Sequence, residues 1–153
     1  MKKLICGVLV SVLLLAACAG CAKKEPEPSF APSATVQALL DSGAFSETLE
    51  ELDPTLLFSL SGEAEDYEGS VLYYSTGATS EAAAVIATRD ASQAAEAEKV
   101  LEAWVENQIE AVRNYQPAEV EKLEHAIIET RGNTVLLAVA ADWEKAQAAV
   151  PAE

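Results

Sequence analysis

Beyond residue 21 the chain contains no cysteine, and His125 is its only histidine. Without cysteine this long segment has no disulfide framework, so its core alone must stabilise it. One histidine and no thiol cannot supply the about three or four ligands that a zinc site needs. No nucleophile stands in a recognisable arrangement either, so we interpret His125 as a residue on the surface of a strand rather than a general base. The sequence therefore predicts no catalytic residue, no metal and no cofactor.

Basic residues are also scarce. The chain has 10 Lys and Arg against 25 Asp and Glu, a formal charge of −15, and removal of Lys2 and Lys3 with an N-terminal signal makes this −17. A chain of this charge repels nucleic acid and anionic lipid, which argues against nucleic acid as a partner. We interpret the excess acid as a solubility feature, with attraction to a basic partner or cation as the alternative.

The N-terminus has the layout of an export signal. Basic residues 1–3 precede an uncharged apolar run at residues 4–17. The stretch LAAC at residues 15–18 resembles the lipobox of bacterial lipoproteins. The resemblance implies that the sulfur of Cys18 is lipidated and that a peptidase cuts before it, which leaves an acylated (palmitate-type) anchor on the extracytoplasmic face of the cell membrane. Cys21 is the alternative acceptor.

A tether of charged and proline residues follows this cysteine. Residues 22–32 contain three prolines and four charged side chains and have little to bury. We therefore divide the chain into a signal peptide at 1–17, a lipidated cysteine with its tether at 18–32, and a single α+β domain at 33–150. A plain membrane-spanning anchor at 4–22 and ordinary signal cleavage with a soluble product are the alternatives.

Periodicity and turn residues predict the elements of this domain. Short helices come first, and two hairpins then flank one long amphipathic helix, in the order ββαββα. We expect an antiparallel sheet covered on one face by the long helix, an α+β sandwich. Helices are expected at residues 33–41, 54–59, 91–115 and 143–149, an apolar pattern of helical spacing covers 45–52, and strands are expected at 70–75, 83–89, 123–131 and 134–140.

The helix expected at 91–115 has an apolar stripe that includes Leu101, Trp104 and Val112. Charged residues such as Glu102 fall on the opposite side of the helix. A stripe of this kind usually covers the protein's own sheet, and we prefer this interpretation to binding of a partner helix.

Two loops contain polar groups that a ligand could use. Glu63, Glu65, Asp66 and Glu68 gather in one acidic loop, but the ligand register of a calcium-binding loop is missing. Residues 76–80 offer hydroxyls and backbone N–H groups that could cradle a small anion. We interpret the first as a solvated acidic loop and the second as a simple strand connection.

Three runs of sequence carry a further resemblance. GAFSETLEELD at 43–53, YYSTGATSEAAAVIATRD at 73–90 and NYQPAEVEKLEHAIIETRGNTVLLAVA at 114–140, together with the lipobox, resemble the bacterial lipoproteins grouped as domain of unknown function 4358. The resemblance implies a small envelope lipoprotein and brings no activity, substrate or cofactor. We therefore expect a non-catalytic module that binds an envelope protein or a ligand. The alternatives are an accessory subunit of a membrane transporter or other envelope complex, and an enzyme with an unrecognised site.

Overall fold

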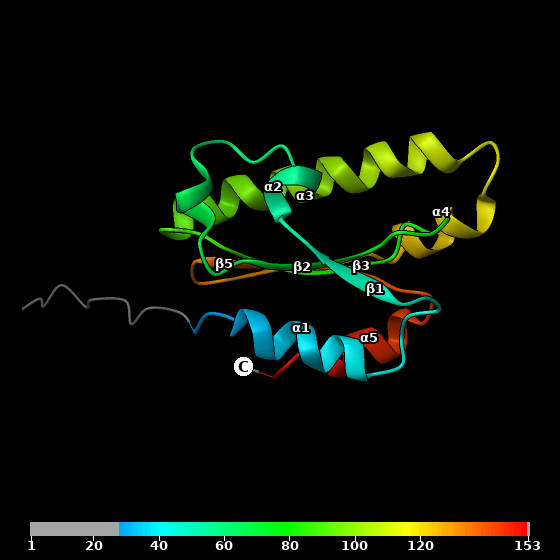
Figure 1. Cartoon of the computed structure of the whole chain (residues 1–153), viewed down its shortest axis with the longest axis horizontal. Helices are drawn as coiled ribbons and strands as arrows, with labels where there is room; N and C mark the ends of the chain where they lie inside the picture. Colours follow the sequence, from blue (N-terminus) through cyan, green and yellow to red (C-terminus); the bar gives the residue numbers. More distant parts are fainter. Residues whose placement is uncertain (1–27, 153) are drawn as a thin grey trace, which may run out of the picture.

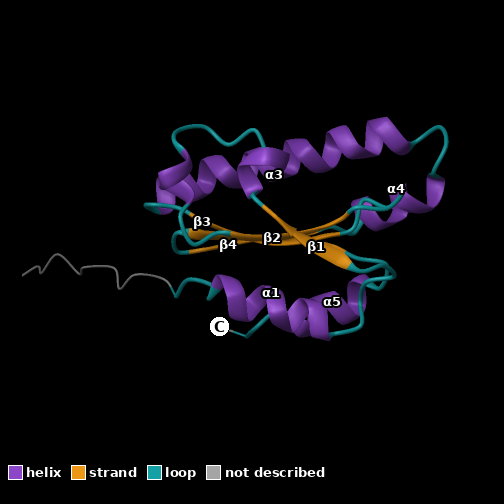
Figure 2. Cartoon of the chain, viewed as in Figure 1, coloured by secondary structure: helices purple, strands orange, loops and turns teal. Residues whose placement is uncertain are grey.

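Five strands form one antiparallel sheet in the order β1-β2-β3-β5-β4, and helices lie against both of its faces (Figures 1 and 2). The computed structural model describes residues 28–152. The strands are β1 (Leu49–Leu52), β2 (Val71–Ser75), β3 (Ala82–Ala87), β4 (Ile127–Arg131) and β5 (Thr134–Val139). The helices are α1 (Pro32–Asp41), α2 (Pro54–Leu57), the 3₁₀ helix η1 (Ala64–Tyr67), α3 (Ala91–Val112), α4 (Pro117–Glu124) and α5 (Trp143–Ala149).

The two central strands consist mainly of small and branched apolar residues. β3 and β5 pair along their whole length, from Ala82 opposite Val139 to Ala87 opposite Thr134. Because helices cover both faces, neither strand alternates between apolar and polar side chains. The turn that joins β4 to β5 contains Gly132 at a φ of 54°, a left-handed conformation that glycine adopts easily. The predicted hairpin is therefore confirmed, and its second strand lies in the interior of the sheet.

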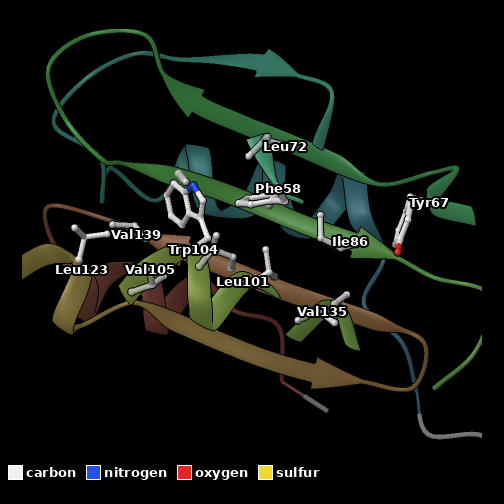
Figure 3. Packing of buried hydrophobic residues seen from close by; sticks show 14 of the residues in the cluster. Phe58, Tyr67, Leu72, Ile86, Leu101, Trp104, Val105, Leu123, Val135 and Val139 are labelled. Carbon is white, nitrogen blue, oxygen red and sulfur yellow. The ribbon is translucent and has the colours of Figure 1, made fainter. Parts of the chain in front are cut away.

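One face of the sheet, which we call the α3 face, is covered by α3 with α4 and α2. Trp104 of α3 lies edge-on to Phe58, with 5.4 Å between ring centroids, and to Tyr74, with 6.2 Å. Leu101 lies one turn earlier on the same side of the helix and packs against Ile86 in the same cluster, as Figure 3 shows. The apolar stripe of α3 therefore covers the protein's own sheet, which confirms the prediction.

The opposite face, which we call the α1/α5 face, is covered by two short helices. Leu39 of α1 and Ala146 of α5 are fully buried with Val85 and Leu136 of the central strands. Figure 1 shows both helices beneath the sheet. The α+β class, the antiparallel sheet and the long helix over one face are confirmed, and the structure adds this second helical layer.

Two segments differ from their expected structure. Residues 45–52 have helical spacing, yet they contain β1, which pairs with β2 from Leu49 opposite Ser75 onward. Leu123 was expected to begin a strand, yet it lies in α4 and the strand starts only at Ile127. Proline is favoured in the first turn of a helix, so the proline at the start of α4 begins a new helix as well as preventing α3 from continuing.

The first described residues are held against the β4–β5 turn. The Ser29 hydroxyl donates to the side-chain oxygen of Asn133 over 2.7 Å, and the Phe30 N–H donates to the Thr134 hydroxyl over 2.9 Å. The Phe30 ring is buried, with the Arg131 guanidinium 4.3 Å from its centroid. In the described part of the chain, the packed domain therefore includes Ser29 and Phe30, which precede the expected boundary at residue 33.

Candidate functional site: a buried polar cluster

A fully buried carboxylate lies at the start of β3. Glu81 has no exposed surface, although three of the next residues are alanines. One of its oxygens accepts from the backbone N–H of Ser46 over 2.9 Å and more weakly from that of Glu47 over 3.4 Å. The other accepts from the Ser46 hydroxyl and from Lys122. A buried charge is tolerated only when it is paired and hydrogen-bonded, and Glu81 meets both conditions.

Lys122 of α4 joins two carboxylates. Its Nζ lies 2.8 Å from Glu81 Oε1 and 2.9 Å from Glu119 Oε1. Glu119 and Lys122 are three residues apart in α4, which places both side chains on one side of the helix. The second oxygen of Glu119 accepts from the Ser80 N–H over 2.8 Å. We call Glu81, Glu119 and Lys122 the polar cluster, and its formal charge is −1.

The surroundings favour the ionised forms of Glu81 and Lys122. Burial alone would raise the pKa of the Glu81 carboxyl, but hydrogen bonds from Lys122 and Ser46 outweigh burial and lower that pKa below its usual range. Burial alone would lower the pKa of Lys122, but its hydrogen bonds to the two carboxylates outweigh burial and raise that pKa. Burial raises the pKa of the neighbouring Tyr74, and the charge of Glu119 adds to this shift.

A second set of hydrogen bonds occupies the connection between β2 and β3, where we considered an anion site. Glu47 Oε2 accepts from the Ser75 hydroxyl over 2.7 Å and from the Thr79 hydroxyl over 3.3 Å. A Cβ atom at Gly77 would lie 2.5 Å from that same oxygen, so a side chain at this position would displace the Glu47 carboxylate. The donors of this connection therefore face the protein's own carboxylates, which would repel an added anion.

The polar cluster holds fixed charges and connects separate parts of the fold. Through Glu81 it joins the segment before β1 to the start of β3, and through Lys122 it joins both to α4. General acid–base catalysis works best with a pKa near the operating pH. The pKa values of Glu81, Lys122 and Tyr74 all move away from neutrality. The arrangement is therefore suited to holding elements together.

The acidic loop proposed as a calcium-site candidate is partly folded into η1. Asp66 accepts from the Glu63 N–H over 3.2 Å, and it pairs with Arg89, whose Nε lies 3.2 Å away. These contacts use the carboxylate to cap a turn and to bind a cation of the protein itself. Within residues 28–152, no group of three or more His, Cys, Asp and Glu side chains is arranged to hold a metal ion.

His125 is not in a strand, contrary to the expectation, and lies at the C-terminal end of α4. Its Nδ1 is 2.8 Å from the backbone carbonyl oxygen of Glu121, and its ring stacks on Trp143 with centroids 4.7 Å apart and planes 12° apart. Both side chains are on the surface. The structure therefore places His125 in a surface aromatic pair, and none of its described contacts joins it to the polar cluster.

The sequence analysis did not identify the polar cluster. A signal was present at Glu81, because one acidic residue stands directly before an otherwise apolar strand. Such a residue must find a partner once the strand is buried. The partners were harder to predict, because Lys122 is 41 residues away and lies in α4, a helix that the sequence did not predict.

The predicted lipid-attachment residue Cys18 and its alternative Cys21 lie outside the described residues, as do the signal peptide and most of the tether. The described helices include none that combines the length and the apolar character required to span a bilayer.

The fold and the site together define a small α+β domain with a helical layer on each face of an antiparallel sheet and a buried ion cluster at one end. The family described as domain of unknown function (DUF4358) matches residues 57–140, more than half of the chain, and the protein belongs to this family. No curated protein and no solved structure matches the chain. The match contains the whole polar cluster and leaves out α1, β1 and α5.

Proposed function

We propose that the protein is a lipoprotein of the cell envelope, anchored through Cys18 at the extracytoplasmic face of the cell membrane, and that its domain is a non-catalytic module that binds a protein or ligand. The observation that carries the first part is the LAAC stretch at residues 15–18, which follows a charge-free apolar run. Small residues before the cysteine suit a signal peptidase, and the thiol is the nucleophile that takes the lipid.

The way the chain enters the domain supports a tethered arrangement. The first contacts in the described part of the chain are those of Ser29, which lies eleven positions after Cys18. Proline-rich chain extends by about 3.1 Å per residue, which gives this tether a reach of about 34 Å. A domain held at that distance has access to partners near the membrane surface while its own fold stays clear of the lipid.

The position of the entry point also gives the domain an orientation. The chain enters at the β4–β5 turn, whereas α4 and the β2–β3 connection lie at the other end of the sheet (Figure 1). The proposed tether therefore joins the domain at the end opposite the polar cluster, which leaves that cluster's end at the greater distance along the chain from the anchor.

The pairing of the buried charges favours a binding role over catalysis. Glu81 and Lys122 are bound to each other, and their pKa shifts favour the ionised forms. An enzyme site needs groups whose hydrogen-bonding capacity is available to a substrate. A binding module needs an accessible surface instead, and such a surface is described below.

Metabolic labelling with an alkyne fatty acid tests the anchor. We expect the wild-type chain to take up the label and to fractionate with membranes. Cys18→Ala should lose the label and retain its signal peptide, which intact-mass analysis detects, whereas Cys21→Ala should behave as wild type. Labelling that persists in Cys18→Ala and disappears in Cys21→Ala would move the anchor to Cys21, and an unlabelled wild-type chain would overturn the proposal.

A further inference from the structure

The outer edge of β1 is open. β1 is a terminal strand of the sheet and pairs only with β2, so alternate N–H and C=O groups of its four residues point outward. Within the described chain no strand pairs with this side, and Figure 1 shows β1 at the front of the sheet with no helix drawn over it. Exposed strand edges are usually blocked, because they can pair with another chain.

The other terminal strand, β4, is more buried than β1, and the protein's own contacts hold its C-terminal end. Arg131 at its end donates to Glu129 over 2.6 Å and to the backbone carbonyl of Pro151 over 2.9 Å. Its guanidinium also covers the Phe30 ring. All five residues of β4 are partly buried, whereas three of the four residues of β1 are exposed. The two edges of the sheet therefore differ in how far the rest of the protein covers them.

A groove lies beside the C-terminal end of β1. It has a volume of about 470 Å³ and runs between that strand, the start of α2, and η1, with Leu52, Tyr67 and Leu72 among the residues that line it. Leu52, which lines this groove, is 36% exposed. It therefore offers a contact for one apolar side chain of a bound segment.

The charge around this edge has one sign. Residues 47–68 include eight acidic residues and no basic residue. In the described part of the chain, Glu50, Glu51 and Glu68 take part in no ion pair. Hydrogen bonds from Thr55 lower the pKa of the Asp53 carboxyl, which lies at the end of the strand and stays ionised. Among the described residues, these carboxylates have no basic partner. A segment that approaches this edge therefore meets negative charge that is not neutralised.

We propose that the outer edge of β1 binds an extended basic segment of a partner protein, which adds a sixth strand to the sheet. This proposal rests on the proposed binding role and specifies its ligand. Glu50, Glu51 and Leu52 are consecutive, so their side chains alternate between the faces of the sheet. A strand laid against them places two basic side chains opposite the glutamates and an adjacent apolar side chain next to Leu52. Main-chain hydrogen bonds supply affinity and these side chains supply selectivity.

A second copy of this chain is a poor occupant of the same edge. Pairing of two β1 strands would bring Glu50 and Glu51 of both copies together, and like charges opposite one another destabilise a strand pair. Anionic lipid and nucleic acid are disfavoured by the same charge. A basic protein segment is the occupant whose charge complements the edge.

The test is selection from random displayed peptides, about nine residues long, on the full-length lipidated protein in mild detergent. We expect enrichment of a motif with two basic residues next to an apolar one. The double variant Glu50→Lys/Glu51→Lys should bind the selected peptide at least about tenfold more weakly. Glu102→Lys/Glu106→Lys makes the same charge change on the exposed side of α3 and should leave binding unchanged. Circular dichroism checks that both variants are folded.

Two N-methylated versions of the selected peptide test the strand geometry. Methyl groups on alternate backbone nitrogens block the outward-facing donors in one version and the pairing donors in the other, so only one version should bind. Equal binding of both would overturn strand addition. If the selected peptide bound the β1 variant as tightly as wild type, the binding surface would lie elsewhere on the protein. That result would overturn the β1 proposal but not the proposed binding role. The proposal would be overturned if no peptide were enriched, or if the protein formed a dimer that Glu50→Lys disrupts. Fatty-acid labelling of the same sample tests the anchor independently.

Discussion

The two faces of the sheet are closed in different ways. On the α3 face, one helix of 22 residues crosses the strands and contributes Trp104 to an aromatic group with Phe58 and Tyr74. On the α1/α5 face, helices of 10 and 7 residues share the cover, and Phe30 is the aromatic residue among the buried members of the cluster. The first face is covered mainly by one long helix, with α2 and α4 beside it, and the second by two short helices far apart in sequence.

This difference shows that the matched family segment is smaller than the folding unit. Residues 57–140 contain the sheet except β1, and they contain α3 and α4 of the α3 face but only the last residue of α2. They do not contain α1 or α5, which bury Val85, Leu136 and their neighbours on the second face. Alone, the segment would expose these apolar side chains to water. The flanking helices are therefore required to complete the core.

The largest expected effect is on the α3 face. Trp104→Ala should lower the free energy of unfolding by about 3–5 kcal/mol, because it removes a buried ring and leaves a cavity between Phe58 and Tyr74. Urea denaturation measures this change, and Glu102→Ala on the exposed side of α3 should stay within about 0.5 kcal/mol of wild type. In a Trp143→Phe background, Trp104 fluorescence should resist quenching by iodide. A readily quenched Trp104 would mean that the stripe is open to solvent.

The second prediction concerns the α1/α5 face. Leu39→Ala removes a fully buried side chain of α1 and should destabilise the domain by about 2–5 kcal/mol, below the effect at Trp104 because fewer atoms are lost. Gln37→Ala, on the exposed side of the same helix, is the matched control. Urea denaturation of both variants decides the point. A Leu39→Ala protein as stable as its control would show that α1 is dispensable and that the second face needs no cover.

The third prediction tests the cluster that joins the layers at one end. Glu81→Gln keeps the shape but removes the charge that Lys122 binds, and should lower stability at pH 7 by about 1.5–3 kcal/mol. The folded pKa of Glu81 is below its unfolded value, so its ionisation stabilises the fold above about pH 4.3 and this contribution is lost as the pH falls through the folded pKa. The difference between the two proteins should therefore shrink between pH 5 and pH 3. If the two proteins differed in free energy of unfolding by the same amount at pH 5 and at pH 3, the charge of Glu81 would not contribute to stability.

The smallest effect has the opposite sign. Thr130 of β4 lies opposite Val135, and within the described residues its buried hydroxyl has no hydrogen-bond partner. Thr130→Val should raise the free energy of unfolding by about 1 kcal/mol, because it removes an unsatisfied polar atom without changing the volume. Thr134→Val in the same hairpin should lower the free energy of unfolding. The Thr134 hydroxyl accepts from the Phe30 N–H and donates to the Arg131 backbone carbonyl, and the substitution removes both hydrogen bonds. Thermal unfolding of both variants separates the two cases.

The elements with strong internal patterns were predictable from sequence. The long helix α3 shows its stripe over six turns, and the β4–β5 hairpin has apolar runs around a Gly-Asn turn. β1 has no such pattern, because Leu49 is its single buried residue, and it becomes a strand through pairing with β2. The polar cluster was out of reach for a related reason: the bond from Lys122 to Glu81 depends on where α4 lies in space.

The order of the elements along the chain has a consequence for how the core is completed. α1 is the first helix of the described chain and α5 the last, although both cover the same face. A chain delivered from its N-terminus cannot pair β3 with β5 until residue 139 has emerged, and cannot close this face until residue 149 has followed. Contacts between distant segments form slowly, and incomplete cores expose apolar surface that aggregates. The apolar surface of this face is therefore covered, and its tendency to aggregate removed, only after α5 has emerged and packed.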